Sequence, residues 1–156
     1  MNFLASFLLL ISVSNAEDLS HLRVAKWYSM TPNIVLCNGA QVDQAALDAA
    51  MTEWRNRGEK IGKLIRRSCD QKPNKGEIGI YVTDDMPVDE SYGIAYRSYH
   101  FEHESKYKND IWCARILIDS QYTDSKILLE HELGHAFGFR DTDDRDSIMS
   151  SKGSIY

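Results

Sequence analysis

The stretch NIVLCNGAQVDQAALDAAMTEWRNRG, residues 33–58, joins a strand-like run to an amphipathic helix. Residues 33–37 are rich in branched apolar side chains, which is typical of a buried strand. From about Val42 to Arg57, apolar residues recur at spacings of three and four, which indicates a helix that Asp43 can cap and Gly58 can end. Residues 63–69, KLIRRSC, then read as a second strand. A strand–helix–strand order favours a right-handed parallel crossover.

The rest of the chain adds strands and one more helix. Strand-like patterns cover residues 22–28, 77–84, 93–101 and 111–119. A second helix begins after Asp124 or Ser125, runs to about Phe137 and ends at Gly138. We find no repeat, low-complexity tract or linker. The sequence therefore predicts one domain of the α+β class, an α/β-like mixed sheet covered by two main helices.

Composition and the first residues indicate an exported protein. The chain has 156 residues, is 43% hydrophobic and 26% charged, and carries a net charge of −5. Residues 1–16 hold an apolar run from Phe3 to Val13 that is too short to span a bilayer, followed by small residues that suit a signal peptidase. We expect residues 1–16 to be a signal peptide, and residues 17–156 to form the domain outside the cell or in a periplasm. Because no basic stripe is present, we expect neither nucleic acid nor, after signal removal, a membrane as partner. We also expect a monomer.

Three cysteines, Cys37, Cys69 and Cys113, are the disulfide candidates of an exported chain. In a parallel crossover the ends of both strands lie at the same edge of the sheet. Cys37 follows the first strand and Cys69 ends the second, whereas Cys113 starts a later strand and should lie toward the opposite edge. The sequence predicts that Cys37 pairs with Cys69 and that Cys113 is free.

Residues 131–149, HELGHAFGFRDTDDRDSIM, carry the chemistry. On a helix, residues four apart share a face, so His131 and His135 can direct two imidazoles at one point. Zinc favours such nitrogen ligands and leaves one position for water in catalytic sites, and Glu132 can act on that water as general base. The alternative is a helix whose histidines face the core or solvent. Gly138 and, three residues later, Asp141 as a third ligand favour zinc.

This segment resembles the metzincin zinc endopeptidases. The match is H-E-x-x-H-x-x-G-x-x followed by a ligand, and then a Ser-Ile-Met turn that ends at Met149. An aspartate as third ligand is similar to the snapalysin-type secreted proteases, and the order of elements looks like matrixin- or astacin-like domains. The resemblance implies a twisted, mostly parallel sheet with one antiparallel edge strand, and a methionine that forms the floor of the site without binding the metal.

The resemblance also implies a function. We expect a secreted zinc endopeptidase with one zinc per chain, bound by His131, His135 and Asp141, and with Glu132 as general base. Its protein or peptide substrate would add as an extended strand to the edge strand, residues 93–101, through Ala95 or Arg97. Two alternatives remain, a catalytically silent binding protein with the same fold and a zinc hydrolase that acts on a non-peptide bond.

Further polar clusters have simpler explanations. His100 and His103 could hold a second metal, although solvated side chains at a strand end account for them as well. Asp143, Asp144 and Asp146 could bind calcium, but their spacing fits a solvated turn better.

Overall fold

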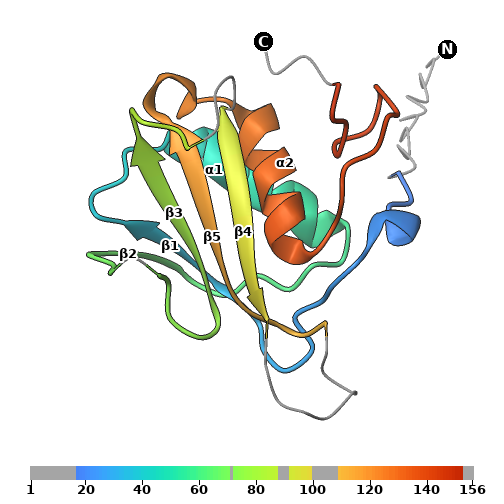
Figure 1. The fold of residues 1–156 in the computed structure, drawn as a ribbon, viewed down its shortest axis with the longest axis horizontal. Coiled ribbons are helices and arrows are strands. Elements are labelled where there is room, and N and C mark those ends of the chain that lie inside the picture. Colours follow the sequence, from blue (N-terminus) through green and yellow to red (C-terminus); the bar gives the residue numbers. More distant parts are fainter. Residues whose placement is uncertain (1–16, 71, 88–91, 100–108, 153–156) are drawn as a thin grey trace, which may run out of the picture.

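In the computed structural model, which describes residues 17–70, 72–87, 92–99 and 109–152, five strands form one mixed sheet (Figure 1). The strands are β1 (Asn33–Cys37), β2 (Leu64–Arg67), β3 (Glu77–Thr83), β4 (Gly93–Tyr99) and β5 (Ile111–Asp119). Their order in the sheet is β2-β1-β3-β5-β4, and every pair is parallel except β4 with β5. The antiparallel strand β4 thus lies at one edge of the sheet. The predicted α+β class with a mixed sheet is confirmed.

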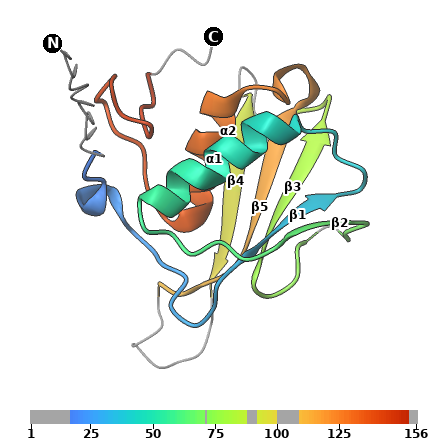
Figure 2. The same cartoon turned by 180° about the vertical axis from the view of Figure 1, so that it is seen from behind.

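The helices α1 (Gln44–Asn56) and α2 (Lys126–Phe137) cover the same face of this sheet. They lie behind the strands in Figure 1 and in front of them in Figure 2, where the molecule is seen from behind. Two short 3-10 turns, η1 (Ser20–Leu22) and η3 (Ser120–Tyr122), flank the regular elements. The helices and the sheet therefore form two layers with the core between them.

The crossover from β1 through α1 to β2 is the one that the sequence predicts. β1 and β2 pair in parallel, with Ile34 opposite Leu64. Asp43 caps α1 by accepting a hydrogen bond from the backbone N–H of Ala46 at 2.7 Å. Along α1, Ala46, Leu47, Ala50, Met51 and Trp54 are buried, so the apolar stripe in the sequence is the face that packs on the sheet.

The core is built from alternate residues of the strands and from one side of α2. The strands contribute Ile34, Leu36, Ile78, Ile80, Ile116 and Ile118, and α2 contributes Leu128, Leu129, Leu133 and Phe137. Each of these side chains is at most 1% exposed, and burial of one such side chain stabilises the fold by roughly 1.5–3 kcal/mol. The alternation in the strands thus fixes which face of the sheet receives the helices.

Residues 22–28 are not the strand that their composition predicts. After η1 the segment makes only isolated bridges, between Arg23 and Phe139 and between Lys26 and Asp110. The backbone N–H groups of Val24 and Ala25 both donate to the carbonyl of Gly138, at 2.8 and 3.2 Å. The segment therefore pairs with the chain that leaves α2, because that turn offers free acceptors close by.

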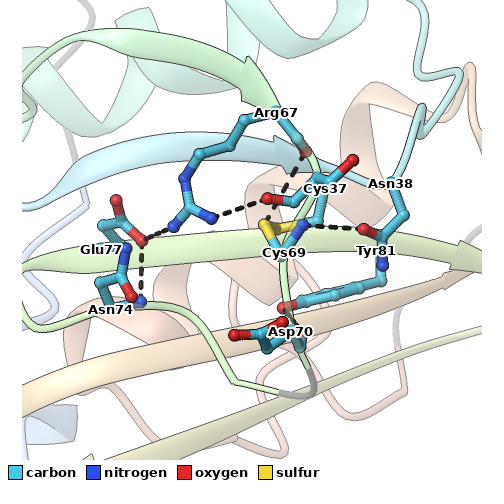
Figure 3. The surroundings of a disulfide bond; sticks show 9 residues. Cys37, Asn38, Arg67, Cys69, Asp70, Asn74, Glu77 and Tyr81 are labelled. Atoms are coloured by element: carbon cyan, nitrogen blue, oxygen red, sulfur yellow. Dashed lines mark hydrogen bonds and ion pairs between the residues drawn. A yellow bond between two sulfur atoms is a disulfide. The ribbon is translucent and has the colours of Figure 1, made fainter.

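The Cys37–Cys69 disulfide joins the end of β1 to the chain just after β2, with the Cα atoms 5.2 Å apart (Figure 3). The backbone N–H of Cys69 donates to the side chain of Asn38 at 2.8 Å, and Arg67 pairs with Glu77 beside the bridge. Cys113 is buried and forms no disulfide. The predicted pairing is confirmed.

Loss of this disulfide should destabilise the fold substantially. The bridge joins residues separated by 32 positions, and closing a loop of that length stabilises a protein by roughly 3–4 kcal/mol. We expect that Cys37→Ala with Cys69→Ala lowers the free energy of unfolding in urea by about that amount, whereas Cys113→Ala lowers it by no more than about 1 kcal/mol. Peptide mapping without reductant that links Cys113 to another cysteine would contradict the assignment.

Candidate metal centre

Helix α2 carries the H-E-x-x-H residues and ends in a turn that only glycine fits well. Ser125 caps its start by accepting from the N–H of Leu128 at 3.2 Å. At its end Gly138 takes a left-handed conformation, with φ 102°, and its N–H bonds to the carbonyls of Gly134 and His135. A Cβ at Gly138 would overlap the carbonyl group of Ala25. The sharp turn that brings Asp141 back toward the helix thus depends on the missing side chain.

Side chains from distant segments hold the last carbonyls of α2. Trp27 donates its indole N–H to Ala136 at 3.0 Å, Arg23 donates to Phe137 at 3.1 Å, and Arg97 of β4 donates to His135 at 3.2 Å. A helix leaves its final carbonyls without partners inside the helix, so the donors to Ala136 and Phe137 satisfy such groups. The carbonyl of His135 accepts from Arg97 as well as from the N–H of Gly138. These side chains also fix the end of the helix that carries the histidines.

His131, His135 and Asp141 meet at one point. The Nε2 atoms of the two histidines lie 3.1 Å apart. The Oδ1 atom of Asp141 lies 3.3 Å from Nε2 of His131 and 3.2 Å from Nε2 of His135. In a tetrahedral zinc site with bonds of about 2.0–2.1 Å, ligand atoms are separated by about 3.3 Å. The three predicted ligands therefore form a triangle whose size is compatible with zinc, and this group could hold a metal ion.

Each histidine uses Nδ1 for a hydrogen bond to a backbone carbonyl, which leaves Nε2, the nitrogen that faces the triangle, as an acceptor. Nδ1 of His131 lies 3.1 Å from the carbonyl of Ile148, and Nδ1 of His135 lies 3.0 Å from that of Phe139. Because a carbonyl only accepts, each Nδ1 carries the proton, and in the neutral ring Nε2 keeps its lone pair. Two lone pairs and a carboxylate facing one another repel unless a cation lies between them. The donor set thus fits a divalent metal with nitrogen and oxygen ligands.

Burial at this point favours the neutral, metal-binding form of the first histidine. Desolvation by burial, followed by the nearby His135, lowers the pKa of His131 below its ordinary value of 6.5. The side chain of Asp141 is 51% exposed, so the triangle is open to solvent on that side. A metal ion or a small molecule could therefore reach the triangle from that side.

Glu132 lies next to this triangle in a buried position. It is 4% exposed, and its Oε2 has no hydrogen-bond partner among the residues that the structure describes. Burial, with a smaller contribution from Asp141, raises the pKa of Glu132 to about 8. A cation bound between the histidines and Asp141 would stabilise the charged carboxylate and lower that pKa. This buried carboxyl is a further observation that the site suits a positive charge.

Met149 lies directly against α2. It is fully buried, and a Cβ at Gly134 would overlap its sulfur atom. The N–H of Thr142 donates to the carbonyl of Met149 at 2.9 Å, while the preceding carbonyl, of Ile148, holds His131. The turn at Met149 is thereby tied both to the segment with the third ligand and to the first histidine. Its role as the floor of a metal site stays a prediction.

The backbone groups of Ala95 and Arg97 lie on the outer edge of strand β4. The N–H of Asp119 in β5 donates to the carbonyl of Tyr92 at 2.9 Å. Hydrogen-bonded pairs alternate along an antiparallel ladder, so the backbone groups of Ala95 and Arg97 point away from β5. Both predicted residues thus direct their N–H groups outward.

Some features of the site carry no signal in the sequence. The carbonyls that orient the histidines belong to the backbone, and Gly93 and Gly134 contribute only the space that they leave. The sequence does not predict that Arg23, Trp27 and Arg97 donate to the end of α2. Their long side chains with donor groups are the one hint of such contacts.

No protein family matches the chain, and no curated protein matches it.

No helix in the described part of the chain has the length and apolar character needed to cross a membrane. His100, His103 and the predicted signal peptide at residues 1–16 lie outside the described residues.

The metal-free protein should lose stability as the pH rises from about 6.5 to about 8. The folded state holds the proton of Glu132 up to about pH 8, whereas the unfolded chain releases it near 4.5, so the free energy of unfolding falls with pH in between. Below pH 6.5 the lowered pKa of His131 makes the free energy of unfolding rise with pH. The effect of Glu132 is therefore seen by itself only above pH 6.5. Melting curves in excess chelator would measure this slope.

Glu132→Gln is the matched control, because glutamine keeps the shape and does not titrate. We expect the decline above pH 6.5 to disappear in this variant. Equal slopes in the two proteins would show that another group is responsible.

Proposed function

We propose that this protein is a zinc-dependent endopeptidase of the metzincin type, secreted and active as a monomer. The observation that carries the proposal is the triangle of His131, His135 and Asp141, in which backbone carbonyls hold both imidazoles with Nε2 facing inward. Glu132 beside this triangle supports catalysis over a purely structural site, because a structural site has no use for a buried general base.

The residues of the chain divide the work of peptide hydrolysis among them. A zinc ion held by His131, His135 and Asp141 would supply Lewis-acid polarisation to a carbonyl group and to a water molecule. Glu132 takes the proton of the attacking water and then delivers a proton to the leaving amine. Its buried position keeps bulk water away from the carboxylate, so the pKa of Glu132 responds strongly to charge in the triangle.

Substrate binding is assigned to the outer edge of β4. The outward N–H and C=O groups of Ala95 and Arg97 can pair with an extended peptide, which would add one more strand to the sheet. The same strand begins at Gly93, beside Glu132. A peptide on this edge would therefore lie along the strand that contacts the general base.

The proposal predicts chelator-sensitive peptide hydrolysis that depends on Glu132. Purified protein should contain about one zinc per chain and cleave casein or a quenched peptide library, and chelation should abolish the cleavage. Glu132→Gln should keep the zinc but lower turnover by roughly 100-fold or more, as removal of a general base does. Metal analysis and cleavage rates measure the two effects separately.

Asp141→Ala should lose most of the zinc, because the triangle loses its only carboxylate. Asp143→Ala is the matched control, since Asp143 is 85% exposed and pairs with Lys152, and it should keep both zinc and activity. If Asp143→Ala loses zinc and Asp141→Ala keeps it, the third ligand is wrongly assigned. Zinc without cleavage of any peptide would instead favour a silent binding protein or a hydrolase of another bond.

Proline at the edge strand should weaken substrate binding with little effect on zinc. Ala95→Pro removes one outward N–H, and the loss of one such hydrogen bond should raise KM roughly 2- to 10-fold. Ala95→Ser keeps the N–H and serves as the control. Steady-state kinetics together with metal analysis make the comparison.

Arg97→Pro needs a different control, because the side chain of Arg97 also donates to the carbonyl of His135. Arg97→Ala removes the side chain and keeps the N–H, so the difference between these two variants reports the backbone hydrogen bond alone. If Ala95→Pro has the same KM as Ala95→Ser, and Arg97→Pro the same KM as Arg97→Ala, the substrate does not bind along this edge.

A further inference from the structure

On the face of β4 that lies toward α2, the side chains increase in size along the strand. Alternate residues of a strand share a face, which places Gly93, Ala95 and Arg97 in one row. Ala95 packs against the core, and Arg97 reaches the carbonyl of His135 near the end of α2. At the start of the row Gly93 lies beside Leu128 and Glu132. The row therefore grows from no side chain beside Glu132 to a long one at the end of the helix.

Gly93 leaves no spare room beside Glu132. A Cβ at this position would lie 2.8 Å from both Cγ and Oε1 of Glu132, and 2.9 Å from Cδ1 of Leu128. Real Cβ atoms essentially never approach other atoms so closely. Because Glu132 and Leu128 are both buried, neither side chain can turn freely into solvent. The carboxyl group thus occupies the space that an alanine side chain would fill.

The backbone gives no reason for a glycine here. Gly93 is not among the glycines with positive φ, which are Gly39, Gly58, Gly76 and Gly138. Glycine inside a strand also weakens the strand, since it loses more conformational freedom on folding and offers no side chain to pack. The compensating gain at Gly93 lies in the contact with Glu132.

We propose that Gly93 is a positioning residue for Glu132. The space that its missing side chain leaves between α2 and the edge strand, which we call the seat, holds the carboxyl group of Glu132. The seat itself follows from the contacts alone. Its consequence for catalysis rests on the proposed function. A Cβ at Gly93 would displace the carboxyl group of Glu132, whereas none of the atoms that it would meet belongs to His131, His135 or Asp141.

A double-mutant cycle tests the seat without any assay of activity. The proteins compared are the parent, Gly93→Ala, Glu132→Ala and the double variant, by thermal unfolding. Gly93→Ala should lower the melting temperature by several degrees in the parent. In the Glu132→Ala background the space left by the carboxyl group also lets Leu128 move, so the shift should be at most about 1 °C.

Gly79→Ala is the matched control, because it is the same change within a strand of the same sheet. Its Cβ would meet Tyr81, Cys37 and Pro73, away from the helices, at 3.1–3.2 Å. Its effect on the melting temperature should therefore be the same with and without Glu132. Independent effects of Gly93→Ala and Glu132→Ala would overturn the proposal.

The catalytic consequence is tested on the zinc-loaded protein. Gly93→Ala should keep the zinc content of the parent and lower kcat about 10-fold or more, with little change in KM, as misplacement of a general base does. Gly79→Ala should keep kcat. Loss of zinc from Gly93→Ala, or an unchanged kcat in a parent that cleaves peptides, would overturn the proposal. If the parent cleaves no peptide, the proposed function fails, whereas the double-mutant cycle still decides whether Gly93 seats Glu132.

Discussion

The turn at Gly138 is the constraint on which the candidate site depends. Its left-handed conformation ends α2 and reverses the chain, and its carbonyl accepts the N–H groups of Val24 and Ala25. A Cβ there would overlap Ala25, so the N-terminal segment can approach only a glycine. This contact helps to tie the N-terminal segment to the end of the helix that carries both histidines, and the turn itself returns Asp141 to them.

The electrostatics of the site make sense only when its charges are considered together. Two imidazoles that keep their inner lone pairs, a half-exposed carboxylate and a buried carboxyl are brought together without a basic side chain in the triangle. Such a set is costly, because Oε2 of Glu132 is buried without a hydrogen-bond partner among the described residues and the acceptors of the triangle face one another. Burial accordingly lowers the pKa of His131 and raises that of Glu132, both toward the neutral form. A divalent cation in the triangle would offset this cost, since it would give both imidazoles and Asp141 a common partner and would stabilise the charged form of Glu132 beside them.

The sequence predicts those parts of the site that depend on local geometry. The spacing of His131 and His135 requires a helix, and Gly138 marks its end, so these positions could be inferred from periodicity and turn chemistry alone. The disulfide could be predicted because a parallel crossover fixes where strands end. Residues 22–28 were wrongly predicted as a strand. Their composition shows that the backbone is extended, but it does not show whether the backbone pairs with a sheet or with a turn.

What the sequence could not predict is tertiary in origin. The acceptors for the histidine Nδ1 atoms are backbone carbonyls, at Ile148 and Phe139, which every residue type possesses. The seat at Gly93 is a space, and a glycine in a strand reads as a weakness until its neighbour is known. Such features appear only once α2 is placed against β4.

The packing of β4 against α2 gives the edge strand two faces with separate tasks. Its outer backbone groups, at Ala95 and Arg97, point away from β5, while Gly93 lies against Glu132 and the side chain of Arg97 reaches the end of α2. β4 is also hydrogen-bonded to β5 along its length, so it is a rigid element and not a loop. Sites held by rigid elements keep their geometry better than sites on loops. A peptide that pairs with this edge would therefore be placed relative to Glu132 and the ligand helix by the sheet itself, without a conformational change to assemble the site.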